Sequence, residues 1–231
     1  MVTKYLLSTL TMGVLMRSES EIRRPGEPGR SRRVRVTGKE RHRQIIEAAA
    51  TLFSQKGFRG TTTREIARTV GVSEAMLFKH FATKEELYAA IIEAKAHVEQ
   101  LMDTVVEAVE RRDDSGVLCT LARELIERTR TDPALMRLTF FSALEGHALS
   151  DMMFRSRVQP LVDFLSRYIT QRIAEGVFRG VDPLQTAWNF LGMVFYHIQL
   201  RELFKQTTKH LTSEQAVDEM VALFLGGVHR S

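Results

Sequence analysis

Apolar residues recur at three- and four-residue spacing along most of this chain, which is the pattern of amphipathic helices. The segment RQIIEAAATLFSQKGF is typical, because one of its faces is formed by Ile45, Ile46, Ala49, Leu52 and Phe53. No stretch alternates apolar and polar residues long enough to predict a half-buried strand. The pattern therefore predicts an all-α fold.

Capping and turn residues divide the next part of the chain into short helices. Gly57 supplies a stop for the first helix. Thr62, followed three residues later by Glu65, forms the capping-box signature of a second helix. Gly71 permits a turn that other residues resist, and Ser73 can cap a third helix. These signals predict two short helices joined by a tight turn.

The third helix carries three large apolar side chains, Leu77, Phe78 and Phe81, which we expect to be buried. Thr83 and Glu86 form another capping box directly after it. A long helix is predicted from there through residue 112.

The remainder of the chain also has helical periodicity. Further helices are predicted over residues 116–130, 133–149, 154–176, 183–204 and 213–225. Pro183 at a first-turn position marks the start of one of them, since its missing N–H costs nothing there. Thr212 and Gln215 mark the start of the last with a third capping box.

Charge is distributed unevenly along the 231 residues. Residues 1–95 contain 18 Lys and Arg against 10 Asp and Glu, whereas residues 96–231 contain 15 against 18. A basic N-terminal part on a mildly acidic remainder favours contact with a polyanion. Cys119 is the single cysteine, which excludes a disulfide framework and a cysteine-based metal cluster and fits a reducing cytoplasm.

Residues 1–38 are expected to form a disordered basic extension. The apolar stretch Lys4–Met16 is too short to span a bilayer, which needs about 20 residues, and no small-residue cleavage site follows it. The Arg-rich residues 23–43 include Pro25 and Pro28 and have the composition of a disordered segment. Two interpretations stay open for them, a basic arm on DNA phosphates and a solvated tail without function.

Two helices too short to be stable alone, joined by a tight turn, are useful when the second must enter a DNA major groove. The first helix and the helix after Thr83 can support such a pair. The inner positions of the pair are predicted to be Ile66, Ala67, Val70, Val72 and Leu77. The outer positions are predicted to be Glu74, Ala75, Lys79 and His80.

Four motifs occur in order across this region: LFxxxGF, TTxREIA, GVSxxxLFxHF and xKEELY. Together they make residues 40–100 resemble the DNA-binding domain of TetR/AcrR-type transcriptional regulators. The resemblance implies a three-helix DNA-binding domain over residues 39–100, with a helix-turn-helix motif at residues 62–81. It also implies a larger helical C-terminal domain over residues 101–231, which binds an effector and forms the dimer.

The resemblance further implies which residues contact DNA. The predicted set is Thr62, Thr63, Arg64, Ser73, Glu74, Ala75, Met76, Phe78, Lys79, His80 and Lys84. Within it the two threonines, the histidine and Lys84 would bind phosphate, and the arginine would bind phosphate or a base edge. The bases would be faced by Glu74, Ala75, Met76 and Lys79.

Other interpretations of these residues remain open. Lys79 can be a solvated lysine, His80 a histidine packed at the domain edge, and Glu74 a charge that favours its helix N-terminus. Phe78 stands where the family usually has tyrosine, so the phosphate contact of that hydroxyl is in question.

One recognition helix reads only a few base pairs, and two-fold pairing supplies a second half-site. The resemblance implies a homodimer in which the last two helices of each chain form a four-helix bundle. The apolar stripes expected at that interface consist of Leu184, Ala187, Leu191, Phe195, Ile198, Val217, Met220, Val221 and Phe224. The alternative is that these stripes pack within one chain.

The C-terminal part is also expected to hold a small amphipathic effector. The candidate residues are Phe140, Phe141, Leu144, His147, Phe154, Trp188, Met193, Tyr196 and His197. Aromatic residues at helical spacing are more often plain core, and that interpretation stays open. No metal or other cofactor is predicted, because the histidines lack a paired ligand spacing.

The leading hypothesis is a cytoplasmic, dimeric transcriptional regulator, most often a repressor, released from a palindromic DNA operator by a small ligand. The alternative is a ligand-independent activator or architectural DNA-binding protein of the same fold. No membrane partner is predicted. An enzyme is not predicted, because the sequence contains no His-Glu zinc motif, Gly-rich phosphate loop or nucleophile elbow.

Overall fold

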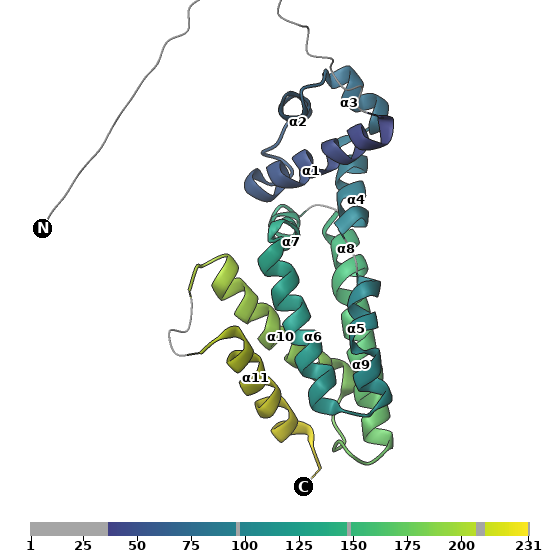
Figure 1. Ribbon diagram of the computed structural model, residues 1–231, viewed down its shortest axis with the longest axis vertical. Helices are drawn as coiled ribbons and strands as arrows, with labels where there is room; N and C mark the ends of the chain where they lie inside the picture. Colours follow the sequence, from purple (N-terminus) through teal and green to yellow (C-terminus); the bar gives the residue numbers. More distant parts are fainter. Residues whose placement is uncertain (1–36, 96–97, 147–148, 207–210, 231) are drawn as a thin grey trace, which may run out of the picture. The chain divides into compact units, whose positions relative to one another are not determined.

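The computed structural model describes residues 37–95, 98–146, 149–206 and 211–230. Residues 1–36 of the predicted N-terminal extension lie outside this range. The described residues are helical apart from their connections and an isolated β-bridge between Phe178 and His229 (Figure 1). The all-α prediction is confirmed. In chain order the elements are α1 (Gly38–Lys56), α2 (Thr63–Val70), α3 (Glu74–His80), α4 (Lys84–Lys95), α5 (Val98–Glu110), α6 (Asp114–Thr131), α7 (Ala134–Leu144), α8 (Leu149–Met153), the π-helix η1 (Phe154–Val158), α9 (Gln159–Ala174), α10 (Pro183–Glu202) and α11 (Ser213–Val228).

The predicted capping boxes form to different extents. At the start of α11 the box is complete, because the Thr212 hydroxyl accepts from the Gln215 N–H and the Gln215 side chain accepts from the Thr212 N–H. At the start of α2 the Thr62 hydroxyl accepts from the Glu65 N–H (3.2 Å), but the Glu65 carboxylate pairs with Lys56 instead of returning to the cap. That box is therefore half formed.

Two predicted helices are shorter in the structure. The helix predicted over residues 133–149 ends at Leu144. The helix predicted over residues 154–176 begins as the π-helix η1, and α9 begins at Gln159. Pro160 accounts for the change, because it has no N–H to donate to the carbonyl four residues earlier. Such π-turns often occur at functional sites.

The first of two buried clusters unites α1 to α4. Its largest side chains include Phe53, Leu77 and Tyr88, which are at most 1% exposed. Leu138 of α7 and Met153 of α8 belong to the same cluster. The N-terminal helices thus pack against residues that follow position 100 in the chain. The domain boundary predicted at residue 100 stays a prediction.

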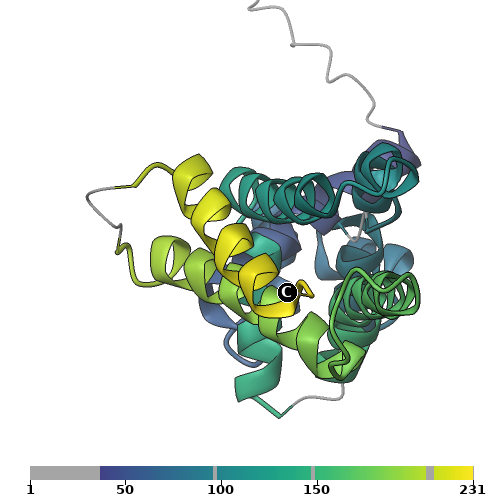
Figure 2. The same cartoon turned by 90° about the horizontal axis from the view of Figure 1, so that it is seen from below.

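The second buried cluster joins α5, α6, α9, α10 and α11 (Figures 1 and 2). The rings of Phe190 on α10 and Phe224 on α11 meet edge to face, with centroids 5.0 Å apart. This packing corrects the predicted dimer interface. In sequence, apolar residues that pack against α6 and α9 of the same chain cannot be distinguished from residues that pack against a second chain. Six of the predicted interface residues are at most 7% exposed within one chain: Ala187, Leu191, Ile198, Val217, Val221 and Phe224.

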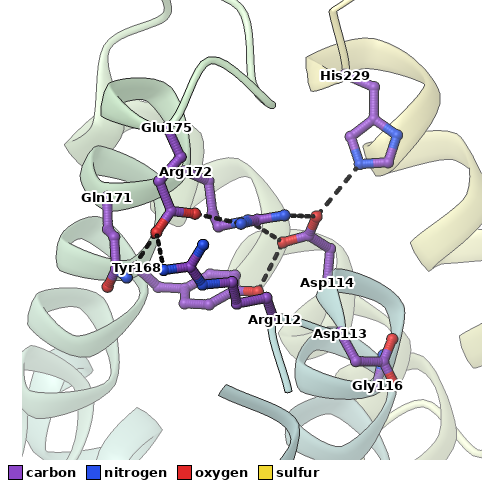
Figure 3. A network of polar contacts seen from close by, with 9 residues as sticks. All are labelled: Arg112, Asp113, Asp114, Gly116, Tyr168, Gln171, Arg172, Glu175 and His229. Atoms are coloured by element: carbon purple, nitrogen blue, oxygen red, sulfur yellow. Dashed lines mark hydrogen bonds and ion pairs between the residues drawn. The ribbon is translucent and has the colours of Figure 1, made fainter. Parts of the chain in front are cut away.

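A buried polar network ties α6 to α9 and to the residues after α11 (Figure 3). The Asp114 carboxylate accepts from Arg172 through both oxygens, at 2.7 and 2.9 Å, and from the Tyr168 hydroxyl at 2.6 Å. Glu175 pairs with the same guanidinium, and His229 Nε2 lies 3.6 Å from Asp114. The side chains of Arg172 and Asp114 are only 8% and 10% exposed.

Candidate nucleic-acid interface and effector cavity

A glycine sets the geometry of the turn between α2 and α3. Gly71 has φ 73° and ψ 36°, the left-handed conformation that ends helices at low cost in glycine. The Gly71 and Val72 N–H groups donate back to the carbonyls of Arg68 and Ala67. The Ser73 hydroxyl then accepts from the Met76 N–H, so α3 starts at once. The turn predicted from the sequence is confirmed.

One face of α3 is exposed and carries Ala75, Met76, Phe78 and Lys79. Met76 is 41% exposed and Phe78 is 45% exposed, whereas Leu77 is fully buried. The prediction that Phe78 is buried was therefore wrong. These four positions share a face because residues three and four apart in a helix lie above one another. We call them the α3 outer face.

Glu74 and Thr63 are engaged with each other within the helix pair. The Thr63 hydroxyl donates to the Glu74 carboxylate at 2.7 Å, which joins the start of α2 to the start of α3. Both side chains are half-buried, while Arg64 next to them is exposed. Through this contact Glu74 positions α3. Recognition of a base by Glu74 stays a prediction.

The two predicted phosphate anchors at the end of α3 and at the start of α4 are also in contact with the protein itself. His80 is half-buried, and its ring lies 5.8 Å from that of His42 on α1. The Lys84 ammonium donates to the Phe58 carbonyl and lies 4.2 Å from the centre of the Phe58 ring. Burial lowers the pKa of Lys84. Lys84 thus supports the loop after α1, whatever it contributes to DNA.

A cavity of about 730 Å³ lies among α4 to α7, η1, α9 and α10. Three predicted effector residues line it, Phe140, Phe154 and Trp188. The rings of Phe154 and Trp188 are stacked with their centroids 5.8 Å apart. A volume of this size suits a small organic ligand, for which 300–1,000 Å³ is usual.

Among the other predicted effector residues, His147 lies outside the described residues. The remaining five do not line this cavity. Leu144 is 84% exposed and Tyr196 is 59% exposed, so neither faces a closed space. Sequence alone does not distinguish which side of α7 or α10 faces inward, because both helices are apolar on more than one side. The residues that this correction concerns are Phe141, Leu144, Met193, Tyr196 and His197.

Several polar residues on the cavity wall were not predicted. Lys95 at the end of α4 lies 2.6 Å from Asp132 and 3.4 Å from Glu47 of α1. Arg157 of η1 donates to the Lys95 carbonyl at 2.8 Å. The signal that was missed is a basic residue three positions before the proline in FRSRVQP.

Helix α7 connects this cavity to the DNA-binding helices. Thr139 and Phe140 line the cavity, whereas Leu138 on the other side of the helix accepts a hydrogen bond from the Tyr88 hydroxyl of α4 (3.0 Å). Burial raises the pKa of Tyr88 to about 12. Glu145, directly after α7, accepts from the Arg59 N–H in the loop between α1 and α2. A shift of α7 therefore moves contacts of both α4 and that loop.

Two other kinds of site are absent from the part of the chain that the structure describes. No group of three His, Cys, Asp or Glu residues there is arranged to hold a metal ion. None of the described helices combines the length and hydrophobicity needed to cross a bilayer.

Comparison with known proteins places both halves of the chain in one group. A model of bacterial regulatory proteins of the tetR family matches residues 45–91, and a model of the AefR-like transcriptional repressor C-terminal domain matches residues 116–227. The nucleoid occlusion factor SlmA of Haemophilus ducreyi is 34% identical over 114 residues, which are 48% of this chain and 52% of that protein. The chain thus spans about half the length of that relative.

Two further relatives match more of their own length. The HTH-type transcriptional regulator RutR of Escherichia coli is 29% identical over 160 residues, or 65% of this chain and 73% of RutR. AibR, solved in complex with isovaleryl coenzyme A and operator DNA, is 27% identical with a TM-score of 0.59. That match covers 80% of this chain and 97% of AibR.

Proposed function

Because the chain belongs to the TetR family of bacterial transcriptional regulators, we propose that it represses transcription by binding a palindromic operator as a homodimer. A small amphipathic ligand in the α4–α10 cavity releases it. Two relatives support this proposal. RutR is a transcriptional regulator, and AibR was solved in complex with both a ligand and operator DNA.

The α3 outer face is the observation that carries the DNA-binding proposal. Its members project from a seven-residue helix that is held from behind by Leu77 and at its start by the Thr63–Glu74 contact. Lys79 can donate to guanine, and Ala75 or Met76 can contact a thymine methyl group. Such a surface next to a tight turn suits a recognition helix in the major groove.

Footprinting of the DNA upstream of the chain's own gene and of its neighbours tests this function. We expect one protected palindrome whose half-sites lie about one helical turn apart, with affinity that falls steeply as salt rises. Equal affinity for the protected site and for random duplex would refute sequence-specific repression. Protection at many sites spread over the chromosome would instead favour an architectural role.

The proposed dimer uses the exposed side of α10 and α11. After the six buried residues are removed from the predicted interface, exposed apolar side chains remain on both helices, including Leu184, Tyr196 and Leu223 at 49%, 59% and 72% exposure. Exposed apolar surface of this kind favours association. Sedimentation of the full chain measures the oligomeric state directly.

Ligand release is proposed to act through α7. A ligand that occupies the cavity presses on Thr139 and Phe140 and so biases the Tyr88–Leu138 and Arg59–Glu145 contacts on the opposite side. It needs to bind the DNA-free conformer more tightly than the DNA-bound one, since only that difference shifts the equilibrium. The cavity favours this mechanism over the ligand-independent alternative.

Phe78→Tyr tests whether the exposed ring lies at the DNA backbone. The added hydroxyl can donate to a phosphate oxygen, so we expect affinity for operator and random duplex to rise alike by about two- to tenfold. Phe204→Tyr is the matched control, because Phe204 is 61% exposed but lies after α10. Unchanged affinity in the Phe78→Tyr protein would place the ring away from the phosphates.

A further inference from the structure

The cavity wall carries charges of both signs, and nearly all of them are neutralised within the protein. Lys95 is neutralised by Asp132 and Glu47, which line the same cavity. Arg128 pairs with Glu124 at 3.1 Å. Glu127 pairs with Arg130 at 2.6 Å.

Arg157 is the exception on this wall. Among the described residues no carboxylate lies within ion-pair distance of its guanidinium, which donates once, to the Lys95 carbonyl at 2.8 Å. A guanidinium has five N–H donors, so four remain for other acceptors. Burial and, to a smaller extent, the neighbouring Arg128 lower the pKa of Arg157 to about 10 against the opposing effect of Asp132, and the side chain keeps its charge at neutral pH.

A half-buried cation without an anionic partner is unfavourable, and a carboxylate that binds it removes that cost. The geometry of a guanidinium suits a carboxylate, which can accept two parallel hydrogen bonds from it. The remaining wall is largely apolar, with Phe140, Leu161 and Trp188 among its members. The wall therefore offers one positive charge beside an apolar chamber.

We propose that the effector is an amphipathic monoanion whose carboxylate pairs with Arg157 while its apolar body lies against Phe140, Leu161 and Trp188. This inference rests on the proposed effector site and specifies its ligand class. A monoanion fits better than a phosphate monoester, because a second negative charge would meet Asp132 and Glu47 without a free cation. The π-turn of η1 presents both Phe154 and Arg157 to the cavity.

The proposal also gives the ligand a route to the DNA-binding helices. The Arg157 guanidinium holds the last carbonyl of α4, the helix that starts beside the recognition helix. A carboxylate that binds the remaining donors draws the guanidinium towards the cavity and so shifts its bond to that carbonyl, and Lys95 at this position also pairs with Glu47 of α1. Ligand charge thus changes contacts at the end of α4.

Trp188 is the single tryptophan and lines the cavity, so its fluorescence reports binding without a label. The full-length chain is titrated with decanoate, 1-decanol, decylammonium and decyl phosphate, all below micelle-forming concentrations. We expect decanoate to bind at least about tenfold more tightly than 1-decanol, decylammonium to bind weakest, and decyl phosphate to bind no better than decanoate. Equal binding of decanoate and 1-decanol, or no change in emission with any probe, overturns the proposal.

Arg157→Gln should weaken decanoate binding by at least about tenfold and change 1-decanol binding by less than threefold. Arg155→Gln is the matched control, since Arg155 is an exposed arginine on the same π-helix that does not line the cavity. Unaltered decanoate affinity in the Arg157→Gln protein overturns the proposal. The wild-type comparison of probes decides the question even if this variant does not fold.

The titration contains no DNA, so it separates this inference from the proposed function. A chain that prefers decanoate but protects no operator keeps the ligand class and loses repression. A chain that protects an operator but does not distinguish decanoate from 1-decanol keeps repression and loses the ligand class.

Discussion

Asp114→Ala is expected to lower the free energy of unfolding by about 3–5 kcal/mol, the usual cost of breaking a buried ion pair by removing one of its members. In the wild-type chain the Asp114 carboxylate accepts two hydrogen bonds from the Arg172 guanidinium and one from the Tyr168 hydroxyl, at 2.6–2.9 Å (Figure 3). Removal leaves the 8% exposed Arg172 guanidinium with only Glu175 as its carboxylate partner, beside a Tyr168 hydroxyl without an acceptor. Urea unfolding at a fixed protein concentration measures the loss.

Asp113→Ala provides the matched control. Asp113 is exposed and caps α6 through a 2.8 Å bond from the Gly116 N–H, so its loss should cost only about 1 kcal/mol. Replacing both Asp114 by leucine and Arg172 by methionine should restore part of the stability, because apolar residues of similar volume remove both charges. If Asp114→Ala costs no more than Asp113→Ala, the network does not hold α6 to α9.

The same network gives the stability a dependence on acid. Burial alone would raise the pKa of Asp114, but the hydrogen bonds from Arg172 and Tyr168 outweigh it, so the pKa is lowered in the folded chain. The contribution of ionised Asp114 to the free energy of unfolding is therefore complete above the unfolded-state pKa of about 4. It is lost as the pH falls through the folded-state pKa. The difference in stability between the wild-type and Asp114→Ala proteins should narrow below about pH 4. A constant difference from pH 7 to pH 3 would contradict this.

The helix-turn-helix could be predicted because its signals are local. Gly71 adopts the left-handed conformation expected of it, and the Ser73 cap forms. Phe78 was placed wrongly because size and hydrophobicity usually imply burial. Leu77 on the inner face of α3 and Phe81 directly after the helix are buried, whereas Phe78 lies about 100° away from Leu77 around the helix. The exposed ring belongs to the surface that is proposed to contact DNA, where that usual rule does not hold.

The cavity could be predicted only in part because its wall is assembled from distant segments. Phe140, Phe154 and Trp188 were found by residue type, whereas Lys95 and Arg157 are brought together across 62 positions of the chain. Hydrophobic periodicity shows that a face is buried but does not show whether a core, a ligand or a second chain buries it. For that reason six of the nine residues of the predicted dimer stripes are buried within one chain.

Lys79→Ala is expected to lower affinity for the operator by about 1–3 kcal/mol per half-site, or roughly five- to 150-fold, while affinity for random duplex falls much less. The reason is that Lys79 lies on the exposed α3 outer face with Ala75 and Met76, where an ammonium can donate to guanine. Competition binding with operator and scrambled duplexes, each at two salt concentrations, measures the ratio. Lys84→Ala is a poor comparison, because Lys84 also holds the Phe58 carbonyl and would lose packing.

Lys205→Ala is the better control for Lys79→Ala, since Lys205 is an exposed lysine that follows α10 and pairs weakly with Glu202 at 3.7 Å. It removes the same charge from a surface outside the helix-turn-helix, so operator preference should not change. If Lys79→Ala weakens operator and scrambled duplex equally and lowers the salt slope by about one, Lys79 contacts phosphate. Base reading by the α3 outer face would then rest on Ala75 and Met76, and the operator would be recognised through thymine methyl groups and DNA shape.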